Sequence, residues 1–254
     1  MHDVVTTGLL SALRHDGVVI IPHRFDESDL AEIIAYMDDK LVWPAHVVCK
    51  SKVPEFPAGS KTMLQARTDG EWSAFAPTMD TVVGAPYWLE YAISILPLAK
   101  QFFGEPTLLY SLLCFWTQPG RIPYIETHDW HHDQDDRKQL GLFMFGTDII
   151  EDANGAHFYE RGSNNRPEHP VPLFPEAVVA IKGLAGTMWL EQPSGLHCGQ
   201  RPNKSRLYMW ARYGVTDPPP QYVLDGLRPV PKELIGARYP IDPEIQEAIK
   251  LIVA

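Results

Sequence analysis

The chain of 254 residues has only three cysteines, Cys49, Cys114 and Cys198, and no two of them form a Cys-x-x-Cys pair. Their odd number and wide spacing argue against a disulfide framework or a zinc knuckle and fit a reducing compartment. The sequence also lacks any apolar run of the roughly 18–20 residues that a membrane-spanning helix needs. Its start, residues 1–5, has neither the basic nor the apolar region of a secretion signal. We therefore expect a cytoplasmic protein that does not enter a membrane.

Positive charge is scarce as well, because 22 Lys and Arg residues stand against 32 Asp and Glu residues, for a formal net charge of −10. Nucleic acids and anionic membrane surfaces are bound by basic surfaces, so we expect neither as a partner. No Gly-x-Ser-x-Gly sequence, Walker loop or dinucleotide fingerprint occurs, which leaves hydrolase and nucleotide-binding functions without support. A small-molecule substrate remains the expected partner, and no pattern defines the oligomeric state.

Proline, by contrast, is abundant at 23 residues, which favours loops and strand ends over long helices. Residues 1–107 predict a buried strand at 16–21, a helix over about 28–41 and a second helix at 85–103 that is interrupted at Pro97. Between the two helices, residues 43–83 predict an irregular covering loop. After residue 107 the pattern changes to short β-rich runs separated by turn sequences. These runs are residues 108–117, 140–148, 156–160, 177–181, 187–190 and 206–215.

Helices followed by many short strands predict a mainly β protein with flanking helices, folded as a double-stranded β-helix, that is, a cupin-like jelly roll. We expect residues 1–254 to form a single domain. In it, the helical and loop-rich residues 1–107 pack on the barrel, residues 108–215 form the jelly-roll core, and residues 216–254 form a C-terminal extension. This extension is expected to be irregular up to a short final helix that starts at Pro243.

The tripeptide His131-His132-Asp133 is the first candidate for chemistry. Of ten histidines, only His131 precedes an acidic residue in the order His-x-Asp. In an extended chain residues i and i+2 project to the same side, so His131 and Asp133 can bind one metal ion while His132 points away. A solvated acidic loop with surface histidines is the alternative. The preceding turn Pro119-Gly120 and the neighbouring Trp130 favour the metal site, because an exposed tryptophan suits such a loop poorly.

His197 is the candidate for a second imidazole, and it has Gly195 and Gly199 two residues away on either side. Glycines permit a close approach of the backbone, although a core histidine bonded to backbone groups is the alternative reading. Together with His131 and Asp133 it would form a two-His-one-carboxylate set with open positions on the metal. That set is typical of non-haem Fe(II) oxygenases.

The run at residues 206–213 alternates so that Arg206, Tyr208, Trp210 and Arg212 share one face. An arginine inside a barrel is unfavourable unless an anion is bound there, and its planar guanidinium matches a carboxylate. A metal ligand followed by such a strand suits a 2-oxoacid that chelates the metal at one end and is held by guanidinium at the other. The alternative is that one or both arginines face solvent.

These segments together resemble the phytanoyl-CoA dioxygenase family of Fe(II)- and 2-oxoglutarate-dependent oxygenases. The similar pieces follow one another in order from residue 16 to about residue 215, namely residues 16–22, 119–120, 130–133, 151–163, 186–187, 197 and 202–206. The resemblance implies that His131, Asp133 and His197 are the Fe(II) ligands and the catalytic centre. It also implies that Arg206 binds the distal carboxylate of 2-oxoglutarate, with Arg212 as its rival on the same strand face. Gln118 matches a polar pocket position in the cosubstrate site.

The resemblance further implies a dioxygenase that consumes O2 and 2-oxoglutarate, releases succinate and CO2, and hydroxylates an unactivated C–H bond of a small metabolite. Halogenases similar to this family have Gly or Ala in place of the carboxylate, so Asp133 favours hydroxylation. Desaturation, epimerisation or cyclisation by the same centre stay open. So do a cupin-like metalloenzyme without a 2-oxoacid and a non-catalytic jelly-roll protein. Substrate contacts are expected from residues 43–83, from residues 121–130 and from the C-terminal tail. In the first of these segments the candidates for an anionic or polar substrate, or else solvated surface, are His46, Lys50, Lys52, Lys61 and Arg67.

Overall fold

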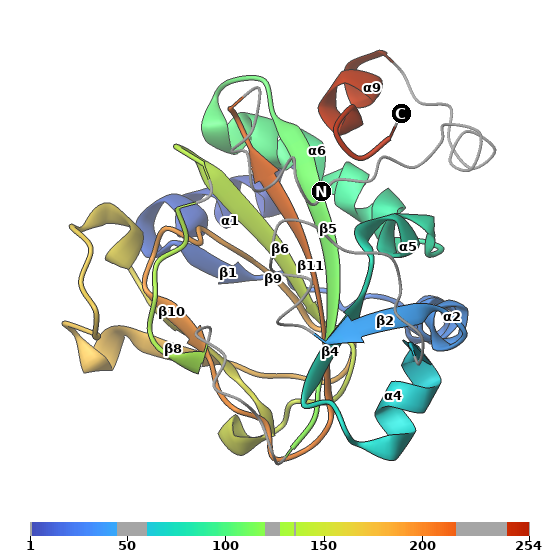
Figure 1. The fold of residues 1–254 in the computed structure, drawn as a ribbon. Coiled ribbons are helices and arrows are strands. Elements are labelled where there is room, and N and C mark those ends of the chain that lie inside the picture. The colour runs from blue at the N-terminus through green and yellow to red at the C-terminus, as the bar shows by residue number, and fades with distance from the viewer. Residues whose placement is uncertain (1, 45–59, 120–127, 135, 217–242, 254) are drawn as a thin grey trace.

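The structure is a computed structural model that describes residues 2–44, 60–119, 128–134, 136–216 and 243–253, and of residues 2–6 only the backbone. Two antiparallel sheets face each other across a barrel interior (Figure 1). The large sheet consists, in spatial order, of β1 (Val18–Ile20), β9 (Met188–Glu191), β6 (Gln139–Phe145), β11 (Arg206–Gly214), β5 (Leu108–Thr117), β4 (Ala74–Pro77), β2 (Leu41–Pro44) and β3 (Lys61–Thr62). The small sheet consists of β10 (His197–Gly199), β7 (His157–Glu160) and β8 (Val178–Ile181). The predicted jelly roll with flanking helices is confirmed.

Strand β11 lies at the centre of the large sheet, between β6 and β5, and its two faces belong to different parts of the core. Leu207, Met209 and Ala211 pack in the cluster that includes the helices, whereas Tyr208 and Trp210 pack in the cluster between the two sheets. This is the predicted alternation, and by the same period of two it places Arg206 and Arg212 on the inner face.

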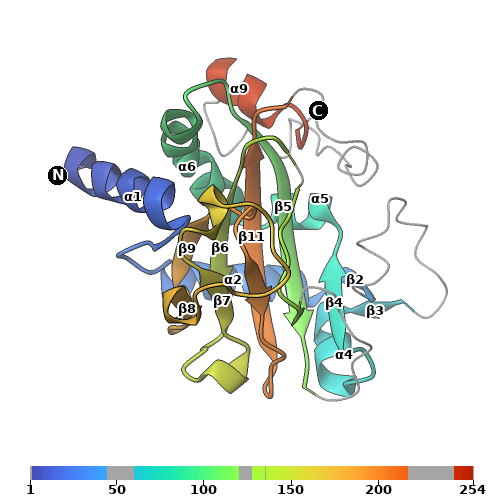
Figure 2. The same cartoon turned by 90° about the vertical axis from the view of Figure 1, so that its left-hand side faces the viewer.

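Helices cover the outer face of the large sheet. In Figure 2 the strands β7 and β8 of the small sheet lie in front of the large sheet, and helix α2 lies behind it. These helices are α1 (His2–Asp16), α2 (Glu27–Asp38), α4 (Met63–Asp69), α5 (Met79–Gly84), α6 (Trp88–Phe103) and α9 (Pro243–Ile249). Three short 3-10 turns, η2 (Asp152–Asn154), η3 (Ser163–Asn165) and η4 (Pro175–Ala177), flank the small sheet. Helix α2 is capped by Asp26, whose carboxylate accepts hydrogen bonds from the backbone N–H groups of Ser28 and Asp29. No helix among the described residues is both long and apolar enough to span a membrane.

The structure differs from the sequence-based expectations at several elements. The helix α1 and the short strand β10 were not predicted. The prediction of an irregular covering loop was wrong for residues 60–83, where the structure has β3, α4, β4 and most of α5. The part of that predicted loop at residues 45–59 lies outside the described residues. The α4 helix starts at a capping box between Thr62 and Gln65, a short signal within a polar stretch.

Helix α6 was predicted to be interrupted at Pro97, but it continues through that residue. One face of this helix is buried in the core, including Trp88, Leu96 and Phe103. Burial of several large apolar side chains outweighs the cost of one proline in a helix, about 3 kcal/mol. The expected final helix does begin at Pro243, whereas the predicted irregular segment at 217–242 lies outside the described residues.

Candidate metal centre

The segment around His131 pairs with the start of β10 and thereby joins the small sheet. The backbone N–H of His131 donates to His197 O over 2.9 Å, and the N–H of His197 donates to His131 O over 3.0 Å. Two residues further on, the N–H of Asp133 donates to Pro193 O over 2.8 Å. These backbone bonds bring together the two distant parts of the predicted ligand set.

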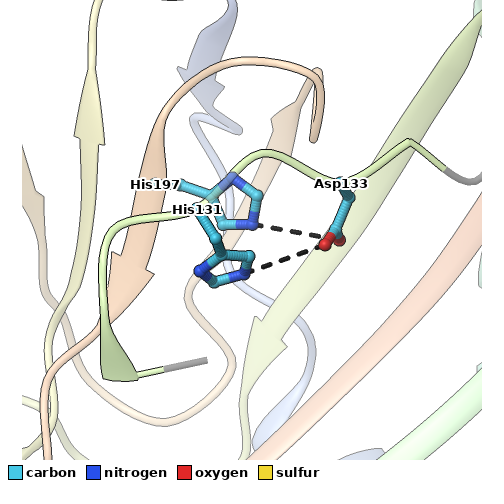
Figure 3. A group of neighbouring side chains, drawn as sticks. All are labelled: His131, Asp133 and His197. Carbon is cyan, nitrogen blue, oxygen red and sulfur yellow. Dashed lines mark ion pairs between the residues drawn. The ribbon is translucent and has the colours of Figure 1, made fainter. Parts of the chain in front are cut away.

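The side chains of His131, Asp133 and His197 converge (Figure 3). Their candidate ligand atoms all lie within 4.8 Å of one another. His131 Nε2 is 3.8 Å from Asp133 Oδ1, and His197 Nε2 is 3.9 Å from Asp133 Oδ2. Both distances are longer than a hydrogen bond, so the three groups face one another without being bonded directly. His132 is directed elsewhere, with its Nδ1 2.7 Å from Ser194 O.

Both candidate histidines are held through the ring nitrogen that faces away from Asp133. Nδ1 of His131 lies 2.7 Å from Asp129 O, and Nδ1 of His197 lies 2.9 Å from Gly195 O. A carbonyl oxygen only accepts, so each Nδ1 carries a proton, and Nε2 is the ring nitrogen that is left to bind a metal. Burial lowers the pKa of His197, by more than the carboxylates of Glu191 and Asp133 raise it. The imidazole is therefore neutral and ready to act as a ligand at neutral pH.

The carboxylate of Asp133 is largely buried and is paired with an arginine of the large sheet. Arg212 Nη2 on β11 lies 2.5 Å from Asp133 Oδ2. Burial alone would raise the pKa of Asp133, but the charge and hydrogen bond of Arg212, together with the neighbouring rings of His197 and His131, outweigh it, and the pKa is lowered. The group is therefore ionised at neutral pH, as a metal ligand must be.

The donor set fits a divalent transition metal. Two imidazole nitrogens and one carboxylate oxygen are the facial set that suits non-haem Fe(II), and three protein donors leave further positions for other ligands. Among the described residues this is the one cluster of at least three His, Cys, Asp or Glu side chains with such spacing. The ring N–H groups bonded to Asp129 O and Gly195 O add the outer contacts that orient metal-binding histidines.

Arg206, predicted to hold a carboxylate, is buried at the start of β11 with 6% of its surface exposed. Its Nη1 donates to Gly155 O over 2.6 Å, and its Nε donates to Thr117 Oγ1 over 3.3 Å. Within the described part of the chain it forms no ion pair with a carboxylate, and its Nη2 has no acceptor. Burial without a counter-charge lowers the pKa of Arg206. A buried guanidinium in this state is suited to bind an anionic ligand.

The other predicted residues have protein partners. Arg212 pairs with Asp133, as described above. The Gln118 side-chain amide donates to Ala66 O over 3.1 Å and to Arg67 O over 3.0 Å, so it attaches α4 to the end of β5. Lys61 forms ion pairs with two carboxylates, and the Arg67 guanidinium lies 2.7 Å from Asp38 Oδ1. These charges are engaged within the protein.

A buried histidine–glutamate contact beside the centre was not predicted. His157 Nε2 lies 2.7 Å from Glu191 Oε2, and the ring centroid of His157 is 5.6 Å from that of His197. Burial would raise the pKa of the fully buried Glu191, but the contact with His157, the nearby His197 and the Trp189 hydrogen bond outweigh this effect, and the pKa is lowered. One signal in the sequence could have indicated a buried carboxylate: Glu191 directly follows the apolar residues of β9, and all four residues of this strand are buried. The partner strand that carries His157 could not be identified from that signal.

Comparison with known proteins supports the fold. No protein-family model matches the sequence, and no curated protein matches it. Among solved structures, the non-haem α-ketoglutarate-dependent epimerase SnoN from nogalamycin biosynthesis is similar with a TM-score of 0.56 and 18% identity over 83% of each chain. The carbocyclase SnoK from the same biosynthesis has a TM-score of 0.53 and 15% identity over 81% of this chain and 82% of its own. HygX from Streptomyces hygroscopicus, solved with nickel and 2-oxoglutarate, has a TM-score of 0.56 and 14% identity over 82% of this chain and 87% of its own.

Proposed function

We propose that residues 1–254 form a single non-haem Fe(II)- and 2-oxoglutarate-dependent dioxygenase domain. Its reaction would be hydroxylation of an unactivated C–H bond of a small-molecule metabolite, with release of succinate and CO2. The observation that carries this proposal is the convergence of His131, Asp133 and His197, with Nδ1 of each histidine bonded to a backbone carbonyl and Asp133 ionised. Bound Fe(II), with 2-oxoglutarate as cosubstrate, supplies the activation of O2 that side chains alone do not provide. Enzymes of similar fold are described as α-ketoglutarate-dependent, and SnoN is known with Fe3+ and α-ketoglutarate.

The roles of the protein groups follow from their contacts. His131 and His197 hold the metal through Nε2, since Nδ1 of each is bonded to a backbone carbonyl. Asp133 supplies the anionic ligand, and Arg212 keeps it ionised and in place. Arg206 binds the distal carboxylate of 2-oxoglutarate. The inward aromatic side chains of β6, β9 and β11 exclude water from the barrel interior behind the metal.

Hydroxylation is the favoured outcome because Asp133 retains the carboxylate that related halogenases replace. The alternative outcomes at the same centre are desaturation, epimerisation and cyclisation. Of these, epimerisation and cyclisation are the reactions for which SnoN and SnoK are named. A cupin-like protein that binds metal but no 2-oxoacid is the alternative outside this class. The buried, carboxylate-free Arg206 favours the 2-oxoacid.

A cytoplasmic location and a small-molecule partner complete the proposal. Cys114 and Cys198 are buried free thiols, as expected in a reducing compartment. The acidic net charge of −10 favours a metabolite over nucleic acid or an anionic membrane.

The proposal is tested by anaerobic titration of the protein with Fe(II) and 2-oxoglutarate, followed by a succinate-release screen against a metabolite panel. We expect a visible charge-transfer band that needs both ligands and is absent in His131→Ala. The surface variant Lys182→Ala serves as the control and should behave as the wild type. A stimulating metabolite then defines the outcome by mass: gain of one oxygen atom for hydroxylation, loss of two hydrogens for desaturation or cyclisation, no change for epimerisation. If metal binds but 2-oxoglutarate does not, the cupin-like alternative is correct.

A further inference from the structure

We propose that His132, the middle residue of the His-x-Asp motif, is a positioning residue for the metal centre. Its ring fixes the backbone turn at residues 192–195, and this turn orients the imidazole of His197. The inference rests on the function proposed above, because it needs a metal at this centre. It gives a role to a side chain that is directed away from the metal ligands.

The first contact of His132 joins the two chain segments that carry the ligands. Nδ1 of His132 lies 2.7 Å from Ser194 O, and because a carbonyl oxygen only accepts, Nδ1 carries a proton and donates it. The next carbonyl along the chain, Gly195 O, lies 2.9 Å from Nδ1 of His197. These two carbonyls belong to neighbouring planar peptide groups, so a displacement of Ser194 O also moves Gly195 O. His132 therefore acts on the orientation of His197 through one residue of backbone.

The same turn is also held by a buried tyrosine of β7. The hydroxyl of Tyr159 donates to Gln192 O over 3.0 Å, and the Tyr159 ring lies nearly parallel to that of His197, at 13° with the centroids 6.4 Å apart. Tyr159 thus fixes the start of the turn, and His132 fixes it two residues later, at Ser194. With both ends attached, the turn presents the next carbonyl to His197 in one defined position.

The other ring nitrogen of His132 is attached to the loop between β7 and β8. Nε2 of His132 lies 3.1 Å from His169 O and 3.3 Å from the backbone N of His169, so it has a backbone partner in either protonation state. His169 is itself fixed, because its own Nε2 lies 2.8 Å from Oε2 of the fully buried Glu160. The His132 ring is therefore held at both nitrogens, and it cannot turn away from Ser194 without breaking a second contact.

Three substitutions of His132 separate its two contacts. Asparagine places its amide near the position of Nδ1 and can still donate to Ser194 O, whereas glutamine places its amide near the position of Nε2 and reaches only His169. Phenylalanine keeps the ring and loses both contacts. The control is His23→Phe, which replaces an exposed histidine after β1 whose Nε2 lies 3.1 Å from Tyr91 Oη.

The first measurement is the affinity for Fe(II), determined anaerobically. We expect His132→Asn and His23→Phe to bind Fe(II) as tightly as the wild type. His132→Gln and His132→Phe should bind it about tenfold more weakly, because loss of an outer contact that orients a ligand typically costs about 10–100-fold in metal affinity. Thermal stability without metal should fall in all three His132 variants, since each loses a hydrogen bond. Stability alone therefore does not produce the expected order of affinities.

The second measurement reports the orientation of His197 directly. In the wild type loaded with paramagnetic Co(II), we expect two exchangeable Nδ1–H signals shifted by the metal, one from His131 and one from His197. In His132→Gln and His132→Phe the signal of His197 should exchange faster with solvent or disappear. The signal of His131 should persist, because its Nδ1 is bonded to Asp129 O. Both signals should persist in His132→Asn.

Equal Fe(II) affinities of His132→Asn and His132→Gln overturn the inference, and so does an unchanged His197 signal in His132→Gln. Either result limits His132 to fastening the loop between β7 and β8. The comparison of asparagine with glutamine decides the question even if His132→Phe does not fold. Wild-type protein that binds neither Fe(II) nor Co(II) overturns the proposed function and the inference with it. Wild-type protein that binds metal but not 2-oxoglutarate contradicts the proposed function alone, because the inference needs only the metal.

Discussion

The guanidinium of Arg212 and the carboxylate of Asp133 form an ion pair in which Nη2 lies 2.5 Å from Oδ2. The two side chains are 19% and 20% exposed, so the pair is mostly shielded from water. This contact separates the two inward arginines of β11, since Arg212 already has a carboxylate of the protein whereas Arg206 has none among the described residues. We infer that Arg212 positions the metal ligand and that Arg206 binds the cosubstrate.

Replacing Arg212 by methionine should destabilise the metal-free protein, because it leaves the carboxylate of Asp133 without its charge partner. Breaking a fully buried pair costs roughly 3–5 kcal/mol, and the partial exposure here reduces the expected loss to about 2 kcal/mol. Chemical denaturation without metal measures this loss. Added Fe(II) should stabilise Arg212→Met more than the wild type, because the cation then takes over the role of charge partner. Arg212→Lys, which keeps the charge, should lose less, and equal metal-free stability of all three proteins would contradict this account.

A comparison of Arg206→Met with Arg212→Met tests which arginine binds 2-oxoglutarate. Arg206→Met should lower the affinity for 2-oxoglutarate about 100-fold, the effect of losing an interaction of about 3 kcal/mol with a charged group. The affinity for 2-oxobutyrate should stay nearly the same, because that ligand has no distal carboxylate. In Arg212→Met any loss should be similar for both oxoacids, since the change acts at the metal. The opposite pattern would transfer the cosubstrate role to Arg212.

Gly155 supports Arg206 by leaving space for it. Its backbone φ is +99°, and a Cβ atom there would lie 3.0 Å from both Cδ and Nη1 of Arg206. Gly155→Ala should therefore cost about 1–3 kcal/mol for the left-handed backbone and should also shift the guanidinium. The matched control is Gly104→Ala, with φ +73° and no atom within 4 Å of the added methyl group. Both variants should lose stability in denaturation, but only Gly155→Ala should bind 2-oxoglutarate less tightly. Equal affinities would show that the methyl group is accommodated without moving Arg206.

The elements that could be predicted from the sequence are those whose own residues carry a recognisable pattern. The strands β5 and β11 were predicted because apolar residues recur along them, and the period of two correctly assigned the inner face of β11. The strand β10 was missed because it is three residues long and lies between glycines, where no periodicity can develop. Helix α6 was predicted to break at Pro97 because local propensity does not include the packing of its buried face.

The candidate centre shows the same limit. The sequence supplied the three residue types and one correct local relation, the i, i+2 spacing of His131 and Asp133. The contact of Asp133 with Arg212 joins residues that are far apart in the chain, and no local pattern encodes it. The strand pattern alone does not separate Arg206 from Arg212, because both lie on one strand face, and only the family resemblance favoured Arg206. They differ only in which backbone and carboxylate groups the tertiary fold brings to each.

His128 offers a spectroscopic reporter of the proposed cosubstrate site at Arg206. Burial lowers the pKa of His128 from 6.5 to about 4, and the charges of Arg206 and Arg201 contribute. An NMR titration of the histidine ring should therefore give a midpoint near pH 4 for this residue. Arg206→Met should raise that midpoint, since one of the nearby positive charges is removed. Binding of 2-oxoglutarate should raise it too, because a dianion offsets the charge of Arg206.

The same residue gives a pH dependence of stability with a defined sign. Because the folded-state pKa of about 4 lies below the unfolded value of 6.5, the unfolded chain takes up the proton first as the pH falls. The wild type should therefore lose stability relative to His128→Asn between pH 6.5 and about 4, and the difference should level off below that range. Urea denaturation of both proteins at several pH values measures it. A constant difference across this range would mean that His128 titrates normally and that the charge of Arg206 does not reach it, which would remove His128 as a reporter of the anion site.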